Sequence, residues 1–111
     1  MQRIGSFTRK DEILEGQVTT LGIQIDVRLV PNPDAEESNT KAPDLLAFAG
    51  GAEIGAAWLK QEGGRPAFYT IRLDDPSWSA PLSAALFQNK HDSKRFDLVW
   101  SRHPVREAAA P

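Results

Sequence analysis

The fold is decided by residues 48–60, which read FAGGAEIGAAWLK. Two adjacent glycines, Gly50 and Gly51, supply the positive φ angles that tight β-hairpin turns need. The residues that follow alternate in the period of two that is typical of a strand. The stretch therefore predicts a hairpin between strands at 45–49 and 53–60. In this prediction Ile54 and Trp58 share one face of the second strand, and Trp58 fills the core.

Similar strand signals recur at short intervals along the chain. In residues 23–29, apolar side chains alternate with Gln24, Asp26 and Arg28, which predicts a strand with one buried and one wet face. Residues 81–87 fit either a short strand or one helical turn. Further strands are predicted at residues 4–9, 13–20, 67–74 and 96–100.

This pattern predicts a mainly β fold. We expect a single small antiparallel sheet or a partly closed barrel of about six to eight short strands, with at most one short helix. A chain of 111 residues is long enough for one domain, which we place at residues 1–102. The acidic segment 34–43 is predicted to be a mobile surface loop, and 103–111 a frayed tail.

The amino-acid composition argues against several classes of function. The chain has no cysteine, which excludes disulfides, thiolate nucleophiles and cysteine-bound metals. No apolar run approaches the roughly 18–20 residues that cross a bilayer, so we expect no membrane partner and a cytoplasmic location. The net charge of −2 argues against a dedicated duplex-DNA binder, which usually carries a basic excess.

The residues that could support catalysis form no recognisable constellation. His91 lies in a polar turn and His103 in the tail, so we interpret both as surface residues. Asp74 and Asp75 are neighbours whose side chains would point to opposite faces of a strand, and we expect them to cap the turn at Pro76. We therefore predict a non-enzymatic protein with no cofactor, no catalytic residues and no metal site.

The aromatic and basic residues are the better candidates for binding. Small β-barrels bind single-stranded nucleic acid by stacking bases on exposed aromatic rings beside basic side chains. Trp58 and Trp100 are expected in the core, whereas Trp78 lies in a loop where burial and exposure are equally plausible, and an exposed tryptophan often anchors a partner. The candidate binding residues are Phe68, Arg72, Trp78, Lys94, Arg95 and Arg102.

Several segments also resemble a known family. They are residues 4–8, 16–21, 42–44 and 48–58, together with 73–77 and 100–102, and the most specific is the block Glu-Ile-Gly-Ala-Ala-Trp at 53–58. In this order they are similar to the bacterial domain of unknown function 736. The resemblance implies a small cytoplasmic protein linked to mobile DNA and assigns no activity.

Two functions remain open from the sequence. The first is a small β-domain that acts through contacts with a protein partner, or through self-association along an open sheet edge. The alternative is an accessory protein that binds single-stranded nucleic acid of a mobile element. The near-neutral charge favours the first function, and the aromatic and basic C-terminal half supports the second.

Overall fold

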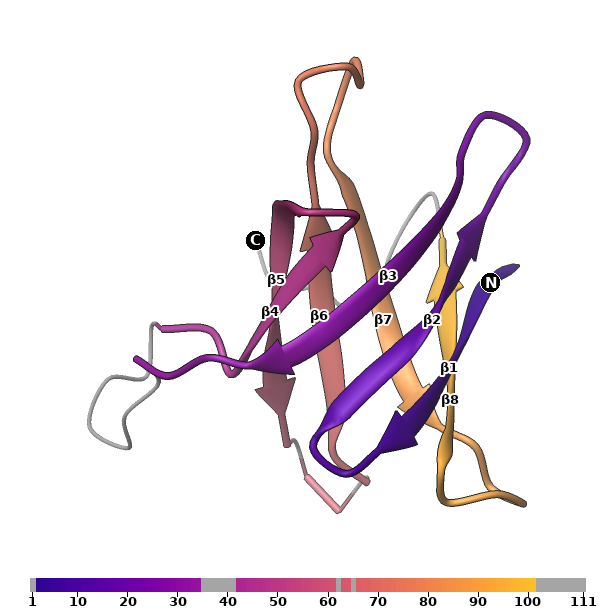
Figure 1. Ribbon diagram of the computed structural model, residues 1–111. Coiled ribbons are helices and arrows are strands. Elements are labelled where there is room, and N and C mark those ends of the chain that lie inside the picture. The colour runs from indigo at the N-terminus through magenta and orange to yellow at the C-terminus, as the bar shows by residue number, and fades with distance from the viewer. Residues whose placement is uncertain (1, 35–41, 62, 65, 102–111) are drawn as a thin grey trace.

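Eight antiparallel strands form the chain into a barrel (Figure 1). The computed structural model describes residues 2–34, 42–61, 63–64 and 66–101. Most of the predicted loop 34–43, Arg102 and the predicted tail 103–111 therefore lie outside the described residues. The strands are β1 (Gln2–Lys10), β2 (Ile13–Thr19), β3 (Gln24–Pro31), β4 (Leu45–Ala49), β5 (Ala52–Lys60), β6 (Phe68–Leu73), β7 (Leu82–Gln88) and β8 (Arg95–Trp100).

Each strand pairs with the next along the chain, and β8 returns to pair with β1. Phe7 on β1, for example, pairs with Gly16 on β2 on one side and with Phe96 on β8 on the other. The strand pairing is therefore continuous across β1, where the barrel closes. The connections alternate between the two ends of the barrel, with β2–β3, β4–β5 and β6–β7 at the upper end of Figure 1. The described strands close into a barrel and leave no open sheet edge, so the edge expected as a route to self-association is absent among them.

The mainly β prediction is confirmed, and the ambiguous segment 81–87 forms most of strand β7, from residue 82 on, rather than a helical turn. Leu86 on β7 is fully buried opposite Leu98 on β8, while Phe87 beside it is exposed. This alternation places one face of β7 in the core and the other in solvent. Among the described residues no helix is long and apolar enough to cross a membrane.

The interior of the barrel is filled by apolar side chains from all eight strands. Val27 and Leu29 of the clearest predicted strand are buried, and Ile25 is half-buried and packs against the core. No polar or charged side chain is buried among the described residues. The buried residues are Ile4, Phe7, Leu14, Val18, Val27, Leu29, Leu45, Ala47, Ile54, Ala57, Ile71, Leu73, Leu86, Phe96 and Leu98.

A register shift in the predicted hairpin changes which face of β5 is buried. Ala47 pairs with Gly55 and Phe48 with Glu53, so Ile54 is an extra residue on β5. A bulge of this kind lets Ile54 and Ala57 both point inward, although they are three residues apart. Trp58, next to Ala57, therefore points outward. The prediction that Trp58 fills the core is wrong.

The β3–β4 connection is held against the lower part of β5. The backbone N–H of Leu59 donates to the carboxylate of Asp44 at 2.7 Å, and the N–H of Asp44 donates to the carbonyl of Ala57 at 2.9 Å. Asn32 adds a side-chain bond to the carbonyl of Pro43 at 3.0 Å. These bonds position the Pro-Asp pair that contributes to the family resemblance.

Candidate binding surface

One side of the barrel presents apolar side chains to the outside. Residues that pair across two strands point to the same side, so the register fixes which outward side chains are neighbours. Trp58 on β5 pairs with Thr70 on β6, Thr70 with Ala85 on β7, and Ala85 with Val99 on β8. All four are half-buried. We call the outward faces of β5, β6, β7 and β8 the apolar wall.

A second row on the apolar wall contains an aromatic pair. Phe68 and Phe87 stack with ring centroids 5.2 Å apart and an angle of 25° between the planes. Lys60 pairs with Phe68 on one side, and Asp97 pairs with Phe87 on the other. The row across the four strands thus reads basic, aromatic, aromatic, acidic. Phe87 is 37% exposed, which leaves part of this platform open to solvent.

The opposite side of the barrel differs in character. Ser6, Gln17 and Asp26 form one outward row across β1, β2 and β3, and Gln17 donates to the Asp26 carboxylate at 2.8 Å. The next row on these strands consists of Thr8, Glu15 and Arg28. We call this surface the polar wall. The barrel fold does not require this contrast between its two outer surfaces, because every strand already contributes buried side chains to the core.

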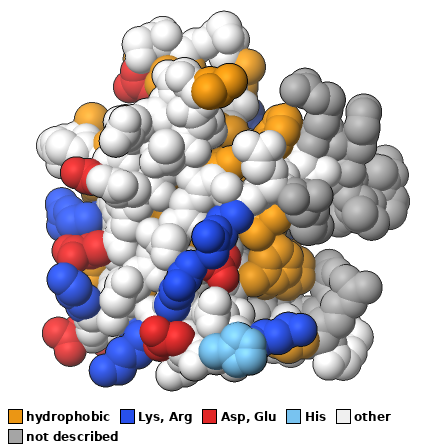
Figure 2. All heavy atoms as spheres, turned by 90° about the vertical axis from the view of Figure 1, so that its right-hand side faces the viewer, with side chains coloured by type: hydrophobic (Ala, Val, Ile, Leu, Met, Phe, Trp, Pro, Cys, Tyr) orange, Lys and Arg blue, Asp and Glu red, His pale blue; other side chains and the backbone are white. Residues whose placement is uncertain are grey.

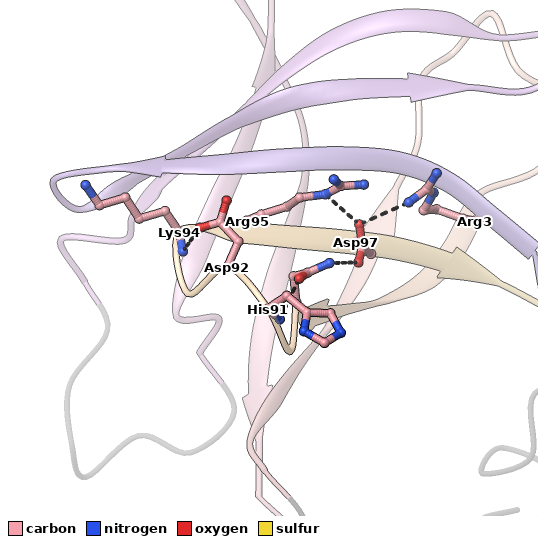
Figure 3. A network of polar contacts seen from close by, with 7 residues as sticks. Arg3, His91, Asp92, Lys94, Arg95 and Asp97 are labelled. Carbon is pink, nitrogen blue, oxygen red and sulfur yellow. Dashed lines mark hydrogen bonds and ion pairs between the residues drawn. The ribbon is translucent and has the colours of Figure 1, made fainter.

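An ion-pair network forms the border of the apolar wall (Figure 3). The Asp97 carboxylate lies 3.2 Å from Nε of Arg95 and 3.7 Å from Nη1 of Arg3, and its other oxygen accepts from Asn89 at 3.2 Å. The Asp97 side chain is 20% exposed and that of Arg3 60% exposed. Two cations therefore share one carboxylate, and the network has a single excess positive charge.

The β7–β8 turn beside this network is organised by its own side chains. Asn89 accepts from the backbone N–H of His91 at 2.8 Å, and Asp92 accepts from the N–H of Lys94 at 3.0 Å. Lys94 extends its amine away from Asp97 (Figure 3). In Figure 2, basic and acidic side chains, the histidine and a group of hydrophobic side chains lie close together on this face. His91 is exposed, as predicted from its polar turn.

Trp78 occupies a different part of the molecule. It lies in the β6–β7 connection at the upper end of the barrel, where it is half-buried and packs against the core. The connection forms an open hollow of about 410 Å³. Its lining consists of Asp74, Asp75, Pro76, Trp78, Ser79, Ala80 and Pro81.

The two adjacent aspartates stabilise this connection, as predicted. Asp74 accepts from the N–H of Asp75 at 2.9 Å, and the Asp75 carboxylate accepts from both the hydroxyl and the N–H of Ser77. These bonds from Ser77 lower the pKa of Asp75 below its ordinary value of 3.8. Among the described residues no group of three or more His, Asp or Glu side chains could hold a metal ion.

The six residues predicted for binding do not form one site. Phe68 and Arg72 share the outward face of β6, as predicted, and Arg95 lies two strands away beside Asp97. Lys94 lies in the β7–β8 turn at the lower end, and Trp78 is at the opposite end of the barrel. Arg102 lies outside the described residues.

The sequence reasoning missed other members of the apolar wall. Trp58, Ala85, Phe87 and Val99 were not predicted to lie on a binding surface. A signal existed in β7, where Ser83, Ala85 and Phe87 alternate with Leu82, Ala84 and Leu86. Once residues 82–88 are taken as a strand, both of its faces are seen to contain apolar residues. A strand that is apolar on both faces is typically packed against other groups on both sides.

Comparisons with known proteins identify the family and assign no activity. No curated protein and no solved structure matches the chain. The family described as "Protein of unknown function (DUF736)" matches residues 3–103, which cover all eight strands except the first residue of β1. By this match the chain belongs to the DUF736 family.

Proposed function

We propose that this protein is a non-enzymatic β-barrel that acts through protein contacts made by its apolar wall. The observation that carries the proposal is the asymmetry of the outer surface. Trp58, Ala85, Phe87 and Val99 point outward on one side, whereas the polar wall has hydroxyl, amide and charged side chains. Contiguous apolar surface on a water-soluble domain commonly marks an interaction site.

The composition of the apolar wall supports a protein partner in particular. Protein interfaces are enriched in tryptophan, phenylalanine and arginine, and their polar groups lie mainly at the rim. The Phe68–Phe87 pair lies in the middle of the apolar wall and Trp58 on β5 at one side of it, while Arg3, Arg95 and Asp97 form an ion-pair network at the opposite border. Continuous strand pairing gives this surface a rigid support that requires little ordering on binding.

The cellular setting belongs to the same proposal. The absence of cysteine fits a cytoplasmic protein. The family resemblance implies a role in the biology of mobile elements. A small barrel that binds another protein of the element, or another copy of itself, fits both statements.

Site-specific photo-crosslinking in cells would test this proposal. A photoreactive amino acid replaces Phe87 on the apolar wall or, as the matched control, Gln17 on the polar wall. We expect discrete protein adducts from position 87 and few or none from position 17. Equal adduct patterns at both positions, or no adduct at position 87, would contradict the proposal.

A second function, binding of single-stranded nucleic acid, has one observation in its favour. The stacked Phe68–Phe87 pair lies in a row with Lys60, and Arg95 binds Asp97 at the other end of that row; aromatic rings beside basic side chains can stack bases. The sharing of Asp97 by Arg3 and Arg95 reduces the positive charge available for phosphates. The observations therefore favour a protein partner.

Fluorescence titration with oligo(dT) separates the two functions. Tryptophan quenching that weakens steeply with salt would support nucleic-acid binding, because such binding releases counterions. We expect no salt-dependent quenching at tens of micromolar protein and low ionic strength. A Phe87→Ala variant is the specificity control, since stacking on the aromatic pair would be lost in it.

A further inference from the structure

We propose that the partner of the apolar wall is a second copy of this chain, bound face to face. This inference rests on the proposed function and specifies its partner. The proposed two-fold axis runs parallel to β6 and β7 and lies between them, in the plane of the interface. It places β6 of one protomer over β7 of the other, and β5 over β8. Such an interface is isologous, so each contact occurs twice.

The strand register makes the apolar wall complementary to itself under this operation. Because the axis follows the strand direction, each row of outward residues meets the same row of the partner in reverse strand order. Thr70 then faces Ala85 of the second copy, and Trp58 faces Val99. In the next row Phe68 faces Phe87, so two stacked aromatic pairs meet. In the Thr70–Ala85 row small side chains therefore lie next to the axis, whereas in the Phe68–Phe87 row the aromatic rings lie next to it.

The charges on the apolar wall also match under the same rotation. Lys60 at one end of its row faces Asp97 of the second copy at the other end. Arg72 pairs with Ser83 within one barrel, so Arg72 faces Ser83 of the second copy, and the two Arg72 side chains lie one strand apart across the interface, a repulsion that the other contacts must offset. Opposed charges at a rim select partner orientation more than they add affinity. The match therefore favours this arrangement over a random apolar contact.

Asp97 suits this role because its position is fixed within the protomer. Arg3, Arg95 and Asn89 all bind its carboxylate, so it is ordered before association. These same partners partly neutralise it, and the contact with Lys60 is at the exposed rim, where ion pairs contribute little. The apolar and aromatic rows must therefore provide most of the affinity.

The size of the apolar wall sets the expected strength of the dimer. About a dozen outward side chains on four strands can take part, which is fewer than the roughly 20–30 residues per side of a standard interface. The outside of a barrel is also convex, so the contact is centred on β6 and β7. We therefore expect a reversible dimer with a dissociation constant on the order of 1–100 µM.

Sedimentation equilibrium of the full chain tests the dimer directly. The wild-type protein is expected to shift from monomer to dimer over about 1–500 µM, the range that a micromolar dissociation constant requires. Ala85→Arg places a cation beside the axis in each protomer, and these two like charges lie close together across the interface. The substitution should weaken the dimer at least about tenfold. Gln17→Arg adds the same charge on the polar wall and should change nothing. Circular dichroism establishes that both variants remain folded.

Single-cysteine cross-linking tests the geometry, and the cysteine-free chain is well suited to it. Thr70→Cys and Ala85→Cys proteins are mixed with a short bismaleimide, and the mixed 70–85 adduct should dominate. Mixtures that contain Gln17→Cys should yield little adduct. A dimer that cross-links as well through position 17, or is unaffected by Ala85→Arg, would overturn the proposed interface.

The outcomes separate this inference from the proposed function on which it rests. A chain that stays monomeric over the whole concentration range overturns the inference. The proposed function then survives only if position 87 captures a different protein in the photo-crosslinking experiment. If the chain is monomeric and position 87 captures nothing, both are rejected.

Discussion

At the scale of single residues, close backbone packing depends on a strand glycine. Gly16 on β2 lies opposite Phe7, one of the largest fully buried side chains. A Cβ atom at Gly16 would come within 2.1 Å of the carbonyl oxygen of Ser6 and 2.7 Å of the Phe7 ring. Because one neighbour is backbone, rotation of a side chain cannot relieve the contact.

Gly16→Ala is therefore expected to destabilise the protein by at least about 1–3 kcal/mol, the usual cost of overpacking a core. Urea denaturation followed by tryptophan fluorescence measures the loss. Gly22→Ala is the control, because nothing lies within 4 Å of a Cβ at Gly22, and its effect should stay within about 0.5 kcal/mol. Equal stabilities of the two variants would contradict this packing.

The Asp75–Ser77 interaction predicts a pH effect in the acid range. The lowered pKa of Asp75 in the folded state means that its contribution to stability is present above the ordinary value of 3.8. That contribution is lost as the pH falls through the folded pKa. Ser77→Ala removes the hydroxyl donor, so the pKa of Asp75 should rise toward 3.8. NMR titration of the side-chain carboxyl carbon measures it, and an unchanged pKa would exclude the hydroxyl as a cause.

At the scale of elements, the positions of the strands were largely predictable from their alternation. Which face of a strand points into the barrel was not always predictable. The segment 53–60 shows the reason. Ile54 belongs to the core, and strict alternation from Ile54 would carry Trp58 inward. The bulge adds one residue, so Ala57 is buried instead and Trp58 points outward. A bulge depends on the partner strand, and the sequence of β5 alone does not reveal it.

The connection between β3 and β4 supplies a prediction at the same scale. Asp44→Ala removes the acceptor of the Leu59 N–H, and a hydrogen bond to a charged group at an exposed site contributes on the order of 1 kcal/mol. We expect a loss of about this size and faster hydrogen exchange at the Leu59 amide. Asp34→Ala, a carboxylate removed from the same connection, should leave that amide unchanged. Equal exchange rates in both variants would argue against the role of Asp44.

At the scale of the whole molecule, closure of the barrel is the feature that the sequence left open. The positions of most strands follow from local patterns, but their number was predicted only as about six to eight and their order was not predicted. The pairing of β1 with β8 joins the two ends of the described chain, and no local signal specifies it. The candidate site was predicted only in part for the same reason. Phe68 and Arg95 lie on the same side of the barrel only because β7 and β8 follow β6 around it.

Barrel closure predicts that a disulfide can link the first and last strands. Thr8 and Arg95 are paired, so Thr8→Cys with Arg95→Cys should oxidise readily to a monomeric cross-linked protein. The bond should raise stability by about 2–4 kcal/mol, since it closes a long loop of the unfolded chain. Mass spectrometry and thermal unfolding measure both effects. Thr8→Cys with Ser83→Cys, two positions that are not paired, should not form an internal disulfide.

The central claim is that two copies of this barrel associate through the apolar wall. The most direct measurement is a ¹H–¹⁵N NMR spectrum of the full chain recorded as the protein concentration is raised. The account predicts progressive shifts at the amides of Trp58, Ala85, Phe87 and Val99, and unchanged amides at Gln17 and Asp26 on the polar wall. Shifts confined to the polar wall, or a spectrum that does not change at any concentration, would contradict it.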